Sequence, residues 1–326
     1  MSARPAIGVD VGGTRVKAGV VDADGRVVER TEVDTPPLGT PEVLDVIGEV
    51  VETLAAGLPR STRVGIGAAG FVDATRSTVL FAPHLPWRHE PLRDAVTRRT
   101  GRRVLVDNDA NCAAWAEWRF GAAQNEPDLV CLTLGTGIGG AIVVDGRLHR
   151  GRWGVAGEFG HMQVVPDGRP CECGNRGCLE QYASGNALAY AARRAVADDL
   201  PLGRRLVEAA APAAPGGATV GRLAAEGDAD AVEVLAEVGR WLGVGLASLA
   251  AALDPGVFVV GGGVSVAGDL LLEPARETLR RTLTGRGYRP DARVVRAHLG
   301  NDAGLVGAAD LARTRRRPVR SRRPTR

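Results

Sequence analysis

The chain has 326 residues, of which 44% are hydrophobic and 24% are charged, a balance typical of soluble globular proteins. Its length accommodates about two domains of roughly 100–200 residues each, and a chain of this size can bury a core without disulfides. No apolar run approaches the roughly 18 residues of a membrane helix, and the first residues show no signal peptide. We therefore expect a cytoplasmic protein that does not contact a membrane.

The formal net charge of +3 is concentrated at one end of the chain. Residues 313–326 contain eight arginines and no acid, so subtracting their charge leaves −5 for the rest. Two prolines and the lack of apolar periodicity predict that this basic tail is disordered. The tail is then either a solvated, dispensable end or a weak contact for an anion. We expect no specific nucleic-acid partner.

In chain order, the first half alternates short apolar runs with amphipathic stretches, which predicts an α/β fold. We expect Thr40 to cap a helix that has Pro41 in its first turn, and Gly101 and Gly121 to close the helices that precede them. The expected strands are Ala6–Val11, 16–21, Val64–Ala68 and 104–106, and the expected helices are 41–58, Leu92–Thr100 and 110–120.

The second half repeats the pattern of the N-terminus, in which two strands flank a glycine turn. This recurrence suggests two domains of related design. A loop-rich segment, residues 151–180, carries most of the cysteines. The expected elements are strands over Leu129–Leu134, 141–144 and 257–260, a long helix over Ala229–Leu253 and a final helix over 302–312.

Two glycine turns between strands are candidate phosphate-binding loops. In residues 10–17 (DVGGTRVK), Gly12 and Gly13 let backbone N–H groups converge on an anion beside the Thr14 hydroxyl. Asp10, at the strand end, could organise a hydrated Mg²⁺ ion that bridges phosphates. Lys17 belongs to the same motif. A plain hairpin turn is the alternative interpretation.

The second turn, residues 134–140 (LGTGIGG), has the G-x-G-x-x-G spacing of dinucleotide-binding loops, as do residues 65–70. That function requires a helix directly after the glycines, and neither segment has one. The G-x-x-x-x-G-K-[ST] motif of P-loop enzymes does not occur in the sequence either. The remaining interpretation is that two glycine hairpins face each other and bind a triphosphate between them.

A polar triplet, residues 107–109 (DND), follows a predicted strand and precedes a helix. Sites in α/β folds lie at the carboxyl ends of strands, so Asp109 is a candidate general base that accepts a hydroxyl proton. Asn108 could hold a neighbouring hydroxyl group. The alternative is that one of these residues merely caps the helix.

The strongest motif combines His161 with three cysteines at C-x-C-x₄-C spacing, Cys171, Cys173 and Cys178. One imidazole and three thiolates suit tetrahedral Zn²⁺, and four protein ligands leave no open position, so the zinc should be structural. Glu158 and Glu180 flank the cluster. Because carboxylates are harder ligands than thiolates, these two are better interpreted as acceptors for the hydroxyl groups of a polyol.

A third glycine cluster, residues 261–263, follows a predicted strand. Such a turn can lie flat beneath a purine or a ribose. A simple tight turn explains the residues equally well.

Together these motifs resemble the ROK family, named for repressors, open reading frames and kinases. The resemblance spans residues 6 to about 312 and rests on D-x-G-G-T, L-G-T-G-x-G-G, E-x-G-H and C-x-C-G-x-x-G-C-x-E. Residues 132–187 are most similar to the bacterial glucokinases of this family. The resemblance implies a two-domain actin-like ATPase fold whose last helix packs on the N-terminal domain. We accordingly expect a small domain over 1–116 plus 301–312, a large domain over 117–300 and the tail.

The resemblance further implies ATP-dependent phosphorylation of glucose at its 6-hydroxyl, with Mg²⁺ and a structural Zn²⁺. Asp109 would be the base, and His161 would bind both the zinc ion and the sugar. The family also suggests a homodimer or homotetramer. The sugar-binding residues implied are Gly70, Asn108, Asp109, Glu158, His161 and Glu180, and the nucleotide-side residues are Asp10, Gly12, Gly13, Thr14, Lys17, Thr136, Gly137, Gly261 and Gly262.

Two alternatives stay open within this resemblance. Another hexose, such as N-acetylmannosamine, fructose, allose or mannose, could be the substrate, and polyphosphate could replace ATP. The chain could also be a sugar-sensing repressor of the same family. Such repressors carry a helix-turn-helix domain of roughly 60–80 residues before the kinase-like part, and we expect none because the first glycine motif begins at Asp10.

Overall fold

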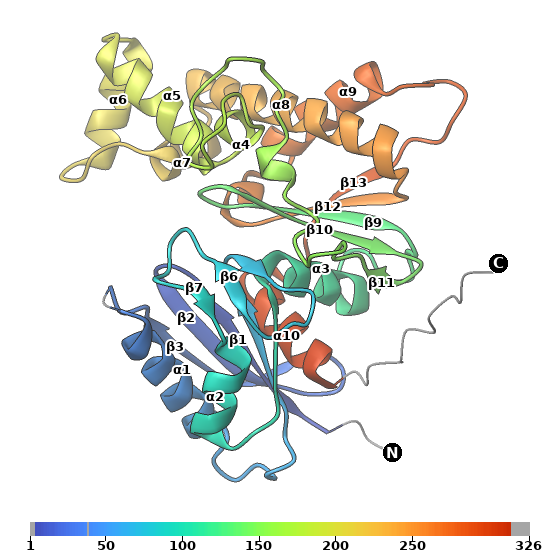
Figure 1. The fold of residues 1–326 in the computed structure, drawn as a ribbon. Coiled ribbons are helices and arrows are strands. Elements are labelled where there is room, and N and C mark those ends of the chain that lie inside the picture. The colour runs from blue at the N-terminus through green and yellow to red at the C-terminus, as the bar shows by residue number, and fades with distance from the viewer. Residues whose placement is uncertain (1–3, 38, 314–326) are drawn as a thin grey trace.

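The computed structural model describes residues 4–37 and 39–313, and in these it forms two five-stranded sheets and one smaller sheet (Figure 1). The first sheet has the order β3 (Val27–Asp34), β2 (Arg15–Val21), β1 (Ala6–Val11), β4 (Val64–Ala68) and β8 (Val104–Asn108). The second has the order β11 (Arg147–Leu148), β10 (Ile138–Val144), β9 (Leu129–Leu134), β12 (Val257–Gly261) and β13 (Arg293–Arg296). The smaller sheet has the order β5 (Phe71–Val72), β6 (Val79–Phe81) and β7 (Arg88–Glu90).

The two larger sheets share one strand arrangement. β1 is antiparallel to β2 and parallel to β4, which is in turn parallel to β8. Likewise, β9 is antiparallel to β10 and parallel to β12, which is parallel to β13. The hairpin turn of each sheet therefore lies at the same edge as the carboxyl ends of its parallel strands, which is where α/β folds place their ligands.

The helices form three layers around these sheets (Figure 1). α1 (Thr40–Leu54) and α2 (Leu92–Thr100) cover the outer face of the first sheet, whereas α3 (Asp109–Phe120) and α10 (Ala303–Arg313) lie between the two sheets. The far side of the second sheet carries α4 (Glu180–Ala183), α5 (Gly185–Ala197), α6 (Pro201–Ala210), α7 (Gly217–Ala225), α8 (Ala229–Leu253) and α9 (Asp269–Thr282). In the part of the chain that the structure describes, three short 3₁₀ turns complete the list: η1 (Phe159–His161), η2 (Gly263–Ala267) and η3 (Gly300–Asp302).

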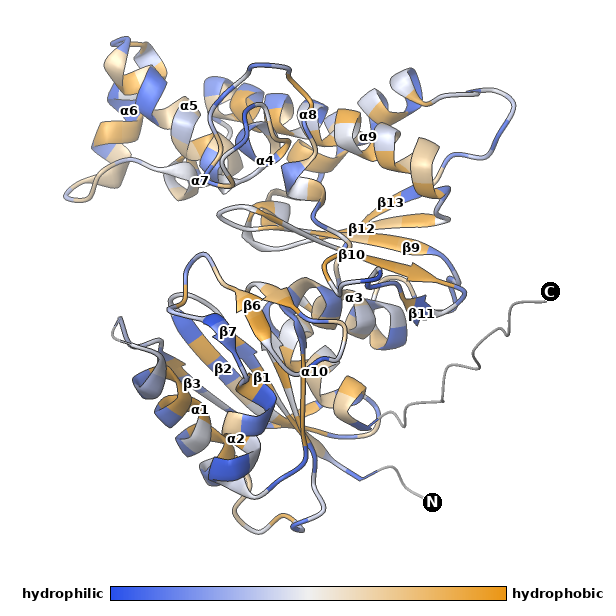
Figure 2. Ribbon diagram, in the orientation of Figure 1, coloured by the Kyte–Doolittle hydropathy of each residue, from blue (hydrophilic) through white to orange (hydrophobic). Residues whose placement is uncertain are grey.

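Each large sheet has its own hydrophobic core. Ile7 and Ile66 of the first sheet are fully buried together with Ile47 of α1. Leu132 and Phe258 of the second sheet are fully buried in a separate cluster with helices that include α8. Figure 2 shows the central strands β9 and β12 of the second sheet as mostly hydrophobic, as expected for strands covered on both faces.

Helix α10 is held between the sheets by direct contact of backbones. A Cβ atom at Gly8 of β1 or at Gly65 of β4 would overlap the backbone of α10 at Leu305 and Ala308. On the other side of the helix, a Cβ atom at Gly307 would overlap the carbonyl of Cys112 in α3. The final helix therefore completes the packing around β1, β4 and α3 from the opposite end of the chain.

The α/β class predicted from sequence is confirmed, and α8 has the predicted bounds. The predicted cap at Thr40 is wrong, because Gly39 is the N-cap and Thr40 lies within α1, with its hydroxyl bonded to the Pro86 carbonyl. That helix also ends at Leu54 rather than at residue 58. Gly101 and Gly121 end α2 and α3 as predicted, Gly101 in the left-handed conformation (φ 63°) and Gly121 with φ −115°.

Sequence reasoning also left several elements unassigned, most clearly β3, whose residues are mostly exposed or half-buried and give no apolar signal. Helix α8 is long and apolar enough to cross a membrane by length and composition, but 56% of its apolar window is buried inside the protein. Buried helices of globular proteins pass the same test, so we assign no membrane span. Of the basic tail, only Arg313 lies within the described residues.

Candidate active site and metal centre

Asn108 and Asp109 lie at the edge of the first sheet, where β8 runs into α3. Asn108 is the N-cap of α3: its side-chain oxygen accepts from the backbone N–H of Asn111 at 3.0 Å. Its Nδ2 atom donates to the Gly70 carbonyl at 3.1 Å and to Asp109 Oδ1 at 2.9 Å. Because Asn108 caps the helix, the carboxyl group of Asp109 is left available for chemistry.

Two half-buried carboxyl groups, Asp10 and Asp109, interact across the intervening strand β4. Asp10 pairs in register with Gly67 of β4, which has no side chain to separate Asp10 from Asp109. Burial raises the pKa of Asp109 above its usual range, against the opposing effect of the N–H groups at the start of α3 and of Asn108. Burial and the charge of Asp109 raise the pKa of Asp10 to about 7, although Lys17 on the facing strand opposes the rise. Such a pair favours a bound cation, which would relieve the charge repulsion.

The first glycine turn is closed by hydrogen bonds from its flanks. Gly12 N–H donates to the Arg15 carbonyl at 3.0 Å, and the Thr35 hydroxyl donates to the Gly12 carbonyl at 2.7 Å. The backbone of Gly13 lies against His84, since a Cβ atom there would stand 2.6 Å from His84 Cβ. The turn is therefore a firmly held backbone loop beside Asp10, as a phosphate-binding loop requires.

The second and third glycine turns lie together at the edge of the second sheet. Gly262 has a φ of 82°, and a Cβ atom on it would stand 2.5 Å from the Leu134 carbonyl. The start of α5 closes the second turn, because Gly185 N–H donates to the Gly135 carbonyl at 2.9 Å and Asn186 N–H to the Thr136 carbonyl at 3.0 Å. The two predicted nucleotide loops of this sheet are thus adjacent in space.

Three acidic side chains from distant segments converge near the end of β8. Burial raises the pKa of Glu158 to about 7, and the charges of Asp109 and Glu180 add to the rise. Glu180 Oε2 accepts from the backbone N–H of Ile138 at 2.9 Å, which fixes its carboxylate beside the second glycine turn. A cluster of half-buried acids suits a ligand that is rich in hydroxyl groups.

The predicted metal ligands come together in one cluster. The ligand atoms of His161, Cys171, Cys173 and Cys178 all lie within 4.8 Å of one another. Cys171 Sγ is 3.7 Å from His161 Nδ1, and the Sγ atoms of Cys173 and Cys178 are also 3.7 Å apart. Two thiolates at about 2.3 Å from a tetrahedral Zn²⁺ would stand roughly 3.8 Å apart. The residues therefore fit a structural zinc ion.

Residues 6–315 match the ROK family. The chain belongs to the ROK family. The expected actin-like ATPase fold is confirmed by the similarity to ROK structures.

Among curated ROK relatives, a glucokinase from Streptomyces coelicolor is 49% identical over 315 residues, which is 94% of this chain and 97% of the relative. Among solved ROK structures, a glucokinase from Streptomyces griseus in complex with glucose and AMPPNP aligns with a TM-score of 0.87 at 50% identity, covering 95% of this chain and 99% of that one. An inorganic polyphosphate/ATP-glucomannokinase from an Arthrobacter strain aligns less well, with a TM-score of 0.64 at 28% identity over 94% of this chain and 98% of that one.

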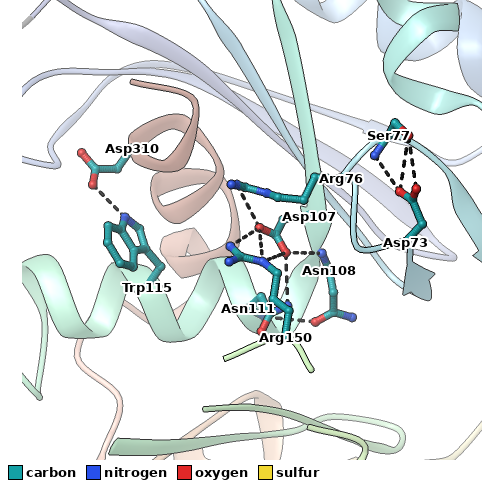
Figure 3. Close-up of polar contacts among 9 residues, drawn as sticks. All are labelled: Asp73, Arg76, Ser77, Asp107, Asn108, Asn111, Trp115, Arg150 and Asp310. Carbon is teal, nitrogen blue, oxygen red and sulfur yellow. Dashed lines mark hydrogen bonds and ion pairs between the residues drawn. The ribbon is translucent and has the colours of Figure 1, made fainter. Parts of the chain in front are cut away.

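One buried polar network of this ROK protein went unnoticed in the sequence (Figure 3). The side chain of Asp107 is only 2% exposed and accepts from Arg150 Nε at 3.1 Å and from its terminal nitrogen at 2.6 Å. A terminal nitrogen of Arg76 is 3.0 Å from the same carboxylate, and Asn111 Nδ2 donates to it at 3.1 Å. The only sequence signal was the acidic residue at the end of a strand, because neither arginine is near Asp107 along the chain.

Proposed function

We propose that this ROK protein is a glucokinase that transfers the γ-phosphoryl group of ATP to the 6-hydroxyl group of glucose. The observation that carries the proposal is the position of Asp109, a half-buried carboxyl group at the start of α3 whose charge raises the pKa of both Asp10 and Glu158. The similarity to the Streptomyces griseus glucokinase, whose complex contains glucose and AMPPNP, supports both the sugar and the nucleotide.

In this proposal, Asp109 is the general base. Its raised pKa brings it closer to the operating pH, where a base combines an adequate ionised fraction with proton affinity. Asn108 donates to Asp109 Oδ1 and so orients the carboxylate toward the attacking hydroxyl group. The remaining hydroxyl groups of the sugar are assigned to Gly70, Asn108, Glu158, His161 and Glu180.

The nucleotide lies between the glycine turns of the two large sheets in this proposal. Phosphoryl transfer needs positioning and charge neutralisation more than covalent chemistry, which backbone N–H groups and Lys17 can supply. Asp10 is assigned to the hydration shell of Mg²⁺, which when bound neutralises negative charge on the phosphates. The phosphate side is assigned to Gly12, Gly13, Thr14, Thr136 and Gly137, and the adenosine side to Gly261 and Gly262.

Zinc has a supporting role in this proposal. Four protein ligands fill its tetrahedral shell, so it offers no open position for a reacting group. The cluster instead fixes the loops that carry His161 and Glu180, whose Oε1 atom is 3.9 Å from Cys171 Sγ. Loss of zinc should therefore weaken sugar binding rather than slow the transfer step.

We further propose a division into a small domain, residues 1–116 with 301–312, and a large domain, residues 117–300, each built around one of the large sheets. We also propose a cytoplasmic homodimer or homotetramer, without a specific nucleic-acid partner. Gel filtration with light scattering would test the oligomeric state.

A coupled assay of ADP release tests the function directly. The purified protein is given glucose, mannose, fructose, allose, N-acetylmannosamine or N-acetylglucosamine, with ATP or polyphosphate as donor. The proposal expects the highest kcat/KM for glucose with ATP, and formation of glucose 6-phosphate. A higher kcat/KM for another sugar would reassign the substrate, and no ADP release with any sugar would refute the kinase.

A further inference from the structure

The Asp107 network joins the two large sheets next to the proposed sugar site. Asp107 belongs to β8 of the first sheet, whereas Arg150 follows β11 of the second sheet. Both carboxylate oxygens of Asp107 lie 3.1 Å from Arg150 Nε, and one also lies 2.6 Å from its terminal nitrogen. The side chains of Asp107 and Arg150 are only 2% and 20% exposed, so water screens the pair poorly.

Both partners are continuous with proposed sugar-binding residues. Asp107 directly precedes Asn108 and Asp109 on β8, and its Oδ1 atom accepts from the backbone N–H of Asn108 at 3.1 Å. Arg150 begins the loop that leads to Glu158, and its carbonyl accepts from Ala156 N–H within that loop at 3.1 Å. The ion pair therefore links the segment that carries the base with the segment that carries an acid of the sugar pocket.

The rest of this loop also contacts the first-sheet side of the protein. Gly154 has a φ of 93°, and a Cβ atom on it would overlap the Val72 carbonyl and stand 2.6 Å from the backbone nitrogen of Ala74. The turn after β5 is itself fixed by the carboxylate of Asp73, which accepts from Ser77 N–H at 2.8 Å (Figure 3). The same turn places Arg76 on Asp107. The 150–158 loop thus packs against a turn that is fixed by hydrogen bonds, and the Arg150 guanidinium lies at the start of the loop.

We propose that Arg150 is a positioning residue of the sugar site. By forming an ion pair with Asp107, it holds the 150–158 loop so that Glu158 faces Asp109. This inference rests on the proposed function. An arginine suits the role because its planar fork meets both carboxylate oxygens at once, which a lysine cannot do. The nucleotide turns lie on other segments, so this device acts on glucose and on the transfer step, and not on ATP binding.

The test compares Arg150→Met, Arg150→Lys and the control Arg152→Met, which changes an exposed arginine of the same loop. Arg150→Met should raise the KM for glucose about tenfold or more and lower kcat/KM for glucose about 100-fold, because misplacement by about 1 Å has effects of this size. The KM for ATP should stay within about twofold. Arg150→Lys should fall between the wild type and Arg150→Met, and Arg152→Met should match the wild type.

A second measurement separates positioning from folding. Arg150→Ala leaves a space of guanidinium size, so millimolar methylguanidinium should restore part of its glucose affinity and activity but should have no such effect on the wild type. An Arg150→Met protein whose KM for glucose stays within twofold of the wild type, with only kcat reduced, would overturn the inference. So would equal increases in the KM values for glucose and ATP.

Calorimetry of glucose binding without nucleotide keeps this test apart from the proposed function. If the wild type binds glucose but fails to phosphorylate it, the proposed function fails while the loss of glucose affinity in Arg150→Met still tests the positioning role. If the wild type phosphorylates glucose and Arg150→Met binds glucose as tightly as the wild type, only the positioning role fails.

Discussion

Asp10→Asn should make the ligand-free protein more stable above neutral pH and less sensitive to pH. Burial and the charge of Asp109 raise the pKa of Asp10 from 3.8 to about 7. In the unfolded chain this carboxyl group ionises near its ordinary pKa. Between these two values the folded state therefore holds a proton that the unfolded state has lost, so its stability decreases as the pH rises through this window.

The size of the effect follows from the size of the shift. Each pKa unit corresponds to about 1.4 kcal/mol, so the rise from 3.8 to about 7 corresponds to roughly 4 kcal/mol. Between pH 5.5 and about 7, this effect of Asp10 lowers the free energy of unfolding by roughly 2 kcal/mol. An asparagine at this position has no such effect because it does not ionise. Glu158, whose pKa is also raised to about 7, contributes in the same window, so the difference between wild type and variant is what isolates Asp10.

Urea unfolding of both proteins at pH 5.5 and pH 8, with zinc retained and Mg²⁺ absent, measures the difference. From pH 5.5 to pH 8, we expect the free energy of unfolding of the wild type to fall by about 2 kcal/mol more than that of Asp10→Asn. Saturating Mg²⁺ with a nucleotide should remove most of that difference at pH 8, since the cation favours the ionised carboxylate. Parallel pH dependences of the wild type and Asp10→Asn would refute the electrostatic reasoning.

Three further predictions address the base, the zinc and the packing of the last helix. Asp109→Asn should reduce kcat by about 10²–10⁴-fold with little change in the Kd for glucose, and near wild-type turnover would remove Asp109 from the role of base. Cys173→Ala should lose zinc and raise the KM for glucose more than it lowers kcat, and unchanged zinc content by atomic absorption would contradict the ligand assignment. Gly307→Ala should destabilise the fold by about 1–3 kcal/mol or more, because its Cβ atom would overlap the Cys112 carbonyl in α3. Gly221→Ala in α7, where a Cβ atom meets nothing within 4 Å, is the matched control and should be neutral or slightly stabilising in urea unfolding.

Elements with a strong local pattern were predictable from the sequence. The apolar periodicity of α8 gave its bounds, and the close spacing of Cys171, Cys173 and Cys178 identified the metal cluster that the structure brings together. Strand β3 was missed because it lies at a sheet edge with mostly exposed or half-buried residues. The cap at Thr40 was misassigned because Gly39 and Thr40 both suit an N-cap, and the choice depends on a contact between Thr40 and the Pro86 carbonyl.

The arrangement around Asp107 was beyond sequence reasoning for a different reason. Its two arginine partners come from the turn after β5 and from the loop after β11, and no spacing rule connects residues 76, 107 and 150. Their meeting depends on how the two large sheets face each other. Likewise, the pKa shifts of Asp10 and Glu158 arise from burial and from neighbouring acids on other segments, so they exist only in the folded protein.

The backbone contacts of α10 with β1, β4 and α3 have a consequence for the order in which the chain folds during synthesis. Gly8 and Gly65 leave a groove that only the backbone of α10 fills, yet residues 121–302 are made between α3 and that helix. At roughly 5–20 residues per second, the first sheet emerges from the ribosome some ten to forty seconds before its missing helix. The second sheet, whose strands and helices are contiguous in sequence, can finish folding first. The N-terminal part of this protein is therefore the last to reach its native packing, and in the interval its exposed face is the surface that a chaperone would have to protect.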